Sequence, residues 1–148
     1  MMSSEDESNR LWERVETDQD LIEQTIKLAK RDLKTAEHVF KDGDYDWSFA
    51  ISYNAMLQAG RALMFREGVR PRGEFKHVSV VEFVKARFGD EFAEKILFMF
   101  NKIRKKRHAA VYERVDSITR TEAENTLNMA REFVEKTGVI LDKGRGRG

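Results

Sequence analysis

The sequence of 148 residues has no cysteine and only one proline. Without cysteine, the chain cannot form a disulfide, a thiolate metal site, an iron–sulfur cluster or a cysteine nucleophile. It also lacks any run of about 18 consecutive apolar residues, the length that a helix needs to span a bilayer. The acidic N-terminal stretch is followed by no apolar run, which argues against a signal peptide. These absences favour a protein of the cytoplasm with no membrane association.

Charges of the two signs almost cancel, but they are unevenly distributed along the chain. The sequence has 27 Lys plus Arg and 26 Asp plus Glu. Residues 1–20 contain seven acidic residues and two arginines, whereas residues 101–120 contain seven basic and two acidic residues. A local basic segment of this kind indicates an anionic partner more directly than the total charge does.

Apolar residues recur at every third or fourth position through most of the chain, which predicts helices and no strand. We expect four long helices over residues 18–41, 46–67, 90–114 and 121–136, and a short helix over 78–88. Residues 69–77 contain the only proline and no helical period, so they are expected to form a loop. The predicted fold class is therefore all-α, an up-and-down bundle. An acidic segment (1–17) would precede the bundle (18–138), and a disordered tail rich in Gly and Arg (139–148) would follow it.

Several residues are typical of helix ends. Asp44 or Asp46 can cap the second long helix, because a carboxylate there accepts from a free backbone N–H. Thr121 and Glu124 have the spacing of a capping box at the start of the last helix. Gly138 is expected to end that helix.

The basic segment interrupts an apolar stripe. At 100° per residue, Arg107 lies on the same face as Phe100 and Ile103, while Arg104, His108 and Tyr112 share a neighbouring face. A guanidinium facing the core needs a carboxylate, a partner subunit or a bound anion, because an unpaired buried charge costs on the order of several kcal/mol. The alternative is a solvated basic helix end that complements the helix dipole, and this interpretation is preferred for Lys102, Lys105 and Lys106.

The order of motifs along residues 18–136 resembles that of the HEPN family. The resemblance rests on the helical segments 32–37 (DLKTAE) and 50–63 (AISYNAMLQAGRAL), the turn 43–46 (GDYD), the Gly-Val-Arg-Pro loop, His77, and the segment 107–112 (RHAAVY). It implies a small helical domain that forms a homodimer and needs no cofactor. It also implies a possible partner, because many members pair with a minimal nucleotidyltransferase in toxin–antitoxin modules.

Active members of that family carry an Arg followed four to six residues later by a His, and two copies form a metal-independent ribonuclease site across the dimer. Arg107 matches the Arg of this motif. His108 stands where an Asn is frequent, and Tyr112 stands where the His belongs. An unperturbed tyrosine has a pKa of about 10 and is a poor base at neutral pH, whereas an imidazole suits proton transfer there.

Three functions remain open from the sequence. The first is a regulatory module that binds nucleotide or RNA, with phosphate held by Arg104, Arg107, Lys105 and Lys106. The second is an endoribonuclease with Arg107, His108 and Tyr112 as its catalytic residues. The third is a helical adaptor without a ligand. No metal site is predicted, because the three histidines are far apart in sequence, and His77 is interpreted as a loop or cap residue.

Overall fold

The computed structural model describes residues 11–73 and 76–145, and side chains up to residue 143. In these ranges the helices are α2 (Gln19–Lys41), α3 (Tyr45–Arg66), α4 (Lys76–Phe88), α5 (Glu94–Tyr112) and α6 (Arg120–Arg145). Two short strands are also present, β1 (Trp12–Arg14) and β2 (Val69–Pro71). The predicted all-α class is confirmed, with four long helices and one shorter one. None of the helices in the described ranges is both long and apolar enough to cross a bilayer.

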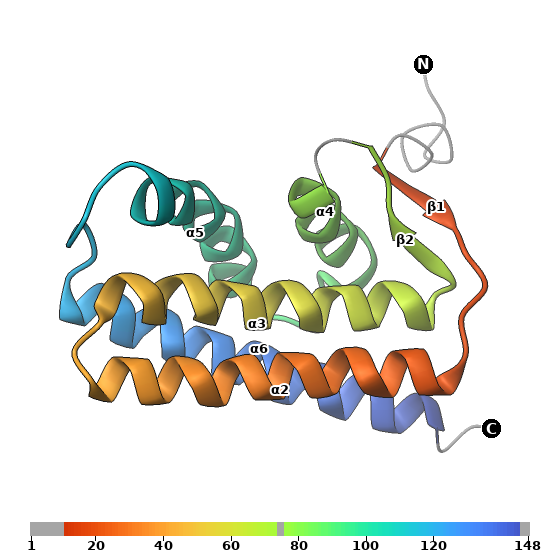
Figure 1. Ribbon diagram of the computed structural model, residues 1–148. Coiled ribbons are helices and arrows are strands. Elements are labelled where there is room, and N and C mark those ends of the chain that lie inside the picture. The colour runs from red at the N-terminus through yellow and green to blue at the C-terminus, as the bar shows by residue number, and fades with distance from the viewer. Residues whose placement is uncertain (1–10, 74–75, 146–148) are drawn as a thin grey trace.

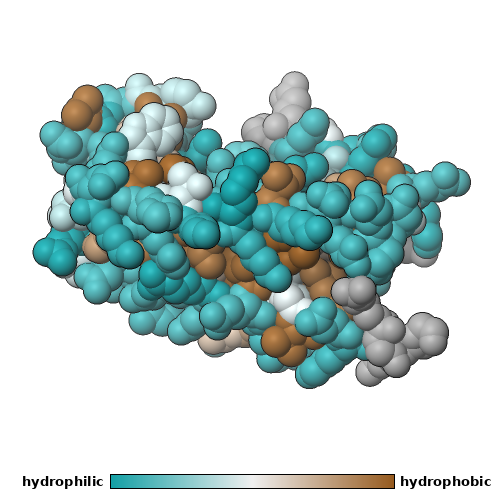
Figure 2. All heavy atoms as spheres, turned by 60° about the horizontal axis from the view of Figure 1, so that its bottom comes forward, coloured by the Kyte–Doolittle hydropathy of each residue, from teal (hydrophilic) through white to brown (hydrophobic). Residues whose placement is uncertain are grey.

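Helix α3 lies at the centre of the molecule (Figure 1). The long helices α2 and α6 pack along one side of it, while α4 and α5 lie over the other side. Most of α3 is therefore buried, including the stripe of Phe49, Tyr53, Met56, Gly60, Leu63 and Met64. Seen from the α2 and α6 side, the surface is mostly hydrophilic, with apolar strips between rows of polar side chains (Figure 2).

A glycine sets the close approach of α3 to α4. A Cβ atom added at Gly60 would lie 2.4 Å from Cγ1 of Val80, far inside van der Waals contact. Val80 is itself only 1% exposed, so it has little room to move. Gly60 thus fixes the position of α4 relative to α3, and with it the position of residues at the start of α4.

Acidic caps begin the first two long helices. Oδ1 of Asp18 accepts a hydrogen bond from the backbone N–H of Leu21 at 2.8 Å, and Oδ1 of Asp44 accepts from that of Trp47 at 3.3 Å. Of the two predicted candidates for the second cap, Asp44 is confirmed. Asp46 has another role, because its carboxylate accepts hydrogen bonds from the backbone N–H groups of Asp116 (2.6 Å) and Ile118 (2.9 Å).

The prediction that the chain has no strand is wrong. Strands β1 and β2 pair antiparallel, with Trp12 opposite Pro71. Three residues are too few to display the alternation that reveals a strand in a sequence. The pair is held by Trp12, which is 7% exposed and packs edge-on against Phe83 with ring centroids 5.3 Å apart.

The capping box of α6 lies two residues earlier than predicted. The capping box is formed by Thr119 and Glu122, since each backbone N–H donates to the other side chain at 3.1 Å. The preceding Ile118 is buried and bound to Asp46, which ends the loop there and places Thr119 at the cap position. Thr121 and Glu124 have the same spacing but already lie within the helix.

The predicted end of the last helix at Gly138 is also wrong, because α6 continues to Arg145. Beyond the glycine, Ile140 and Leu141 are buried, and Nη1 of Arg66 donates to the carbonyl of Ile140 at 2.9 Å. Burial of such side chains contributes about 1.5–3 kcal/mol each, more than the roughly 1 kcal/mol that a glycine costs within a helix. Residues 139–145, which we assigned to a disordered tail, are helical, and residues 146–148 lie outside the described ranges.

Candidate functional site

Arg107 lies on the side of α5 that faces α3. Ile103, one turn earlier, and Phe100, two turns earlier, are buried against the core. The guanidinium carbon of Arg107 is 5.6 Å from the centre of the Tyr53 ring, and its Nε is buried without a hydrogen-bond partner. No carboxylate of the described residues forms an ion pair with Arg107. The aromatic face contributes about 0.5–2 kcal/mol of attraction but offers no acceptor to the buried Nε–H group.

The Tyr53 side chain connects Arg107 to α4. Its hydroxyl oxygen lies 3.1 Å from Nδ1 of His77, close enough to share a hydrogen bond. Burial raises the pKa of Tyr53 well above its usual value, although Arg104 and Arg107 act in the opposite direction. The hydroxyl therefore keeps its proton, and Tyr53 brings no negative charge to the two arginines.

His77 lies in the first turn of α4 and is half-buried. Its pKa is lowered, first by burial and then by the positive charges of Arg107 and Arg104. The imidazole is consequently neutral at pH 7. We call Tyr53, His77, Arg104 and Arg107 the Arg–His cluster.

Asn101 orients the second arginine of this cluster. Its Oδ1 accepts hydrogen bonds from both Nε and Nη2 of Arg104, each at 3.2 Å. Arg104 and Arg107 are three residues apart on one helix, so they are neighbours on its surface. The cluster thus carries two fixed positive charges beside a neutral ring.

The other predicted site residues lie apart from this cluster. His108 and Tyr112 do lie together, with ring centroids 5.1 Å apart, but both are about two-thirds exposed. Nε2 of His108 faces Oε1 of Glu113 at 3.7 Å. Among the described residues, no side-chain hydrogen bond or ring contact joins this pair to Arg107.

The two predicted lysines differ from each other. Lys105 is exposed, as expected of a solvated helix face. Lys106 contacts the carboxylate of Glu122, the capping-box residue, and this hydrogen bond is the largest cause of the lowered pKa of Glu122. Lys106 therefore stabilises the start of α6 and is less available for a ligand.

Sequence reasoning missed Tyr53 and His77 as site residues. The sequence places Tyr53 in a helical segment without marking it as a site residue, and it favours a loop or cap role for His77. One signal was present, because Tyr53 carries the only ionisable group on the buried stripe of the second long helix. Its proximity to Arg107 was not readable, since the two residues are 54 positions apart in sequence.

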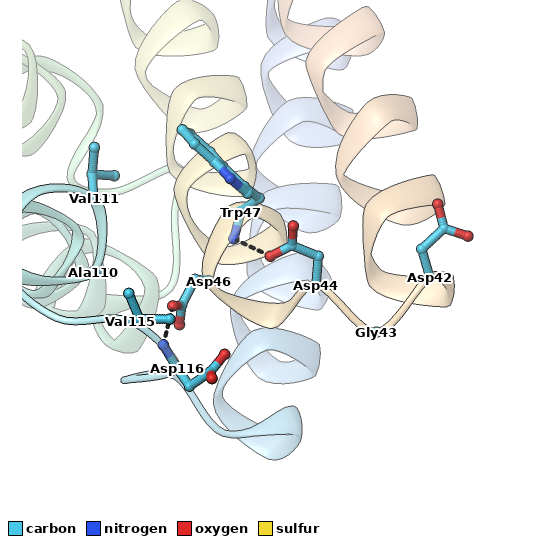
Figure 3. Close-up of a pocket in the computed structure, with 9 residues that line it drawn as sticks. All are labelled: Asp42, Gly43, Asp44, Asp46, Trp47, Ala110, Val111, Val115 and Asp116. Carbon is cyan, nitrogen blue, oxygen red and sulfur yellow. Dashed lines mark hydrogen bonds between the residues drawn. The ribbon is translucent and has the colours of Figure 1, made fainter.

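A concave region lies apart from the Arg–His cluster, where the α2–α3 turn faces the end of α5 (Figure 3). This cavity of about 480 Å³ is lined by Asp42, Gly43, Asp44, Asp46, Trp47, Ala110, Val111, Val115 and Asp116. Two of its carboxylates, those of Asp44 and Asp46, already accept hydrogen bonds from backbone N–H groups. No group of three or more potential metal ligands was found in the described part of the chain.

Comparison with known proteins identifies the family. Residues 22–140 match the model of the HEPN domain. The fold is similar to that of TT1696 from Thermus thermophilus, with 18% identity, a TM-score of 0.65 and coverage of 79% of this chain and 95% of that one. It is also similar to ST0689, an archaeal HEPN homologue, with 22% identity, a TM-score of 0.61 and coverage of 79% and 94%. No curated protein matches in sequence. Because the family match covers most of the sequence, the chain belongs to the HEPN family.

Proposed function

We propose that this HEPN protein binds the phosphates of a nucleotide or an RNA through Arg104 and Arg107. The observation that carries the proposal is the Arg107 guanidinium, which lies on a core-facing seam with a buried, unpartnered Nε and no paired carboxylate among the described residues. A phosphate oxygen can accept two hydrogen bonds from one guanidinium, and such charge-assisted bonds are roughly twice as strong as neutral ones.

The electrostatics of the Arg–His cluster support an anionic ligand. Tyr53 remains protonated and His77 is neutral, so the positive charges of Arg104 and Arg107 are not cancelled within the cluster. Exposed Lys105 adds a further cation on the same helix. A cluster of charges of one sign raises the local concentration of counter-charged ligands.

The family suggests the context in which such binding would operate. We propose a homodimer in the cytoplasm, with a nucleotidyltransferase as partner in a toxin–antitoxin pair. Two large side chains on α5 suit an interface with a second copy, because Phe98 is 66% exposed and Tyr112 is 68% exposed. In such a dimer His108 and Tyr112 would complete the site from the surface of α5.

A metal-independent endoribonuclease is the second candidate, and one specific observation favours it. His77 is a neutral imidazole next to two guanidinium groups, whereas His108 faces Glu113 at the surface. In this reaction the 2′-hydroxyl of RNA attacks the adjacent phosphorus while His77 takes its proton. The bond from phosphorus to the 5′-oxygen breaks, the 5′-oxygen takes a proton from water, and a 2′,3′-cyclic phosphate remains. Arg107 would stabilise the charge that develops on the phosphate.

The test is equilibrium binding of a fluorescently labelled, mixed-sequence single-stranded RNA in EDTA, followed by fluorescence anisotropy. We expect Arg107→Ala to weaken binding about tenfold or more, because a hydrogen bond to a charged group is worth about 1.5–3 kcal/mol. The matched control is Arg31→Ala, which removes the same side chain from the outer face of α2, where Arg31 is 67% exposed. Circular dichroism confirms that both variants fold. If the wild-type protein does not bind, the adaptor alternative is favoured. If Arg107→Ala binds as tightly as Arg31→Ala and the wild type, the RNA is not held by Arg107 and the proposed site is wrong.

The same RNA, resolved on a denaturing gel, tests the ribonuclease candidate. Cleavage that is lost in His77→Ala and retained in His108→Ala would assign proton transfer to His77. The reverse pattern would assign it to His108, which the sequence offers as an alternative catalytic residue. Absence of cleavage by the wild-type protein in EDTA would leave binding as the function.

A further inference from the structure

A cavity of about 410 Å³ lies beside the Arg–His cluster, between α3, β2 and the start of α4. Every charged side chain that lines it, among the described residues, is a cation, and these are Arg61 of α3, Arg70 of β2 and Lys76 of α4. The other walls are mostly apolar and include Val15, Leu21, Leu57, Phe65, Pro71 and Val80. We call this the basic cavity. Its charge suits an anionic occupant.

The cations of the basic cavity are only partly neutralised by the described residues. Nε of Arg70 donates to Oε1 of Glu13 at 2.9 Å, and Nη1 of Arg61 donates to Oε1 of Gln58 at 3.1 Å, so both arginines have only part of their donors engaged. Lys76 is exposed and has no ion pair with a described residue. Attraction between a cation and a carboxylate is screened less against apolar walls than on an open surface. The cavity can therefore accept further carboxylates.

The acidic segment at the start of the sequence leads directly to this cavity. Within residues 1–10, which lie outside the described ranges, residues 5–7 are three consecutive acids (Glu-Asp-Glu) and Arg10 is the only base. We call residues 5–7 the acidic triplet. Leu11 follows this segment, and its carbonyl accepts a hydrogen bond from the backbone N–H of Arg72 at 2.9 Å. The acidic triplet is thus attached to the chain next to β2, which lines the basic cavity.

The acidic triplet is close enough along the chain to reach the cations. Glu7 precedes Leu11 by four residues, and Lys76 follows Arg72 by four residues. Four residues of extended chain span at most about 14 Å, so the two charges can meet. A tether this short gives the triplet an effective concentration on the order of millimolar at the cavity. A segment of the same chain therefore has an advantage over a free acidic molecule.

We propose that the acidic triplet docks in the basic cavity of its own chain and there opposes the binding of RNA at the neighbouring Arg–His cluster. The second half of this inference rests on the proposed function, whereas the docking does not. His77 joins the two places, because it lines the basic cavity while its Nδ1 shares a hydrogen bond with the Tyr53 hydroxyl. Carboxylates held beside His77 repel a phosphate at Arg104 and Arg107. The acidic segment thus lowers the RNA affinity of the site.

Docking is tested by paramagnetic broadening, since a chain without cysteine accepts a single label. A nitroxide attached at Ser4→Cys should broaden the NMR signals of the Val80 methyl groups at low ionic strength. The broadening should be lost in about 1 M NaCl, where the Debye length is about 3 Å. It should also be lost when E5Q/D6N/E7Q is added. Equal broadening with and without the three charges would mean that the tether alone brings the label near, and it would overturn docking.

Two controls separate docking within one chain from other causes. E124Q/E132Q/E135Q removes the same total charge from exposed positions of α6, so the broadening should persist in this variant. Isotope-labelled protein without the nitroxide, mixed with spin-labelled protein, reports contacts between two molecules. Broadening that occurs between molecules and not within one would show that the triplet docks on a second copy, and it would overturn docking in its own chain.

The effect on RNA is measured by the anisotropy assay at low ionic strength. E5Q/D6N/E7Q should bind RNA about threefold or more tightly than the wild type, since three weak ion pairs no longer compete. In a Lys76→Ala background most of this gain should disappear, because the triplet has then lost one of its cations. If E124Q/E132Q/E135Q tightens binding as much as E5Q/D6N/E7Q does, net charge explains the effect and the competition is overturned.

The two proposals can fail separately. RNA binding that depends on Arg107, together with broadening and RNA affinity that do not respond to E5Q/D6N/E7Q, would overturn the docking and leave the proposed function intact. Broadening that depends on the acidic triplet, together with undiminished RNA binding in Arg107→Ala, would do the reverse. Circular dichroism of each variant verifies that it is folded.

Discussion

The α2–α3 turn carries several carboxylates and the Arg–His cluster carries two guanidinium groups. The two regions differ in the hydrogen-bond partners that these charged groups have. At the turn, Asp44 accepts from the first turn of α3 and Asp46 holds the loop before α6. In the cluster, the buried Nε of Arg107 has no hydrogen-bond partner. A buried polar group without a partner in a folded protein calls for a specific explanation, whereas a satisfied one is explained by stability. Charge density alone therefore does not identify a binding site. A buried charged group without a hydrogen-bond partner is the more informative feature.

The largest expected effect is a loss of RNA affinity on substitution of Arg107, without a loss of stability. In Arg107→Met, the side chain keeps much of its length and loses its charge. We expect RNA affinity to fall about tenfold or more, while the free energy of unfolding stays the same or rises, because an unpaired, partly buried cation is removed. Anisotropy with labelled RNA and urea denaturation measure the two quantities. A loss of stability with unchanged affinity would make Arg107 a structural residue.

The opposite pattern is expected at the turn. Asp46→Ala removes the acceptor of two backbone N–H groups, so the free energy of unfolding should fall by about 2 kcal/mol. RNA affinity should not change, because Asp46 lies two helical turns before Tyr53 on α3, about 10 Å along the helix axis, and its carboxylate is engaged by the loop before α6. Chemical denaturation measures the free energy of unfolding, and RNA titration of the same preparation measures the affinity. Weaker RNA binding by a folded Asp46→Ala protein would show that the two regions are not independent.

A pair of glycines tests whether the spacing of α3 and α4 positions the cluster. Gly60→Ala places a Cβ against Val80 and should destabilise the fold by about 1 kcal/mol or more, since overpacking outweighs the gain in helix propensity. Displacement of α4 should also weaken RNA binding, because His77 moves with the helix. In Gly138→Ala the new Cβ has no atom within 4 Å, so we expect a gain of roughly 0.5–1 kcal/mol and unchanged binding. Thermal unfolding of both variants decides the comparison.

The smallest expected effect is a pH dependence caused by His77. Its pKa is lowered in the folded protein by burial and by Arg107 and Arg104. As the pH falls below about 6.5, the unfolded chain therefore binds a proton before the folded protein does, and stability decreases until the pH passes the lowered value. His77→Gln should reduce this decline in the free energy of unfolding between pH 7 and pH 5. An identical decline in both proteins would assign it to other groups.

The helices were predictable because apolar residues recur at every third or fourth position of the sequence. The family match, over residues 22–140, covers the same part of the chain. Arg107 was also identifiable, since a charged residue is unexpected on an apolar stripe that faces the core. The contacts of Arg107 were not predictable, because they depend on how α3, α4 and α5 pack. Tyr53 is a core residue, as its place on the apolar face of α3 indicates, and only the packing of the helices shows that its hydroxyl meets His77 and its ring meets Arg107.

The errors at the ends of α6 have the same origin. Two Thr-x-x-Glu spacings overlap before this helix, and a distant carboxylate, that of Asp46, sets the loop that decides between them. At the other end, the burial of Ile140 and Leu141 outweighs the local signal of Gly138. The local sequence indicates where a helix can begin or end, and tertiary contacts decide which of these positions is used.

The most direct test of the account is the RNA affinity of Arg107→Met and Asp46→Ala, measured side by side with their stabilities. The account predicts that Arg107→Met binds at least about tenfold more weakly and is no less stable than the wild type, whereas Asp46→Ala binds normally and is less stable. If Arg107→Met retains wild-type affinity, the unpartnered guanidinium does not bind phosphate, and the central claim is wrong.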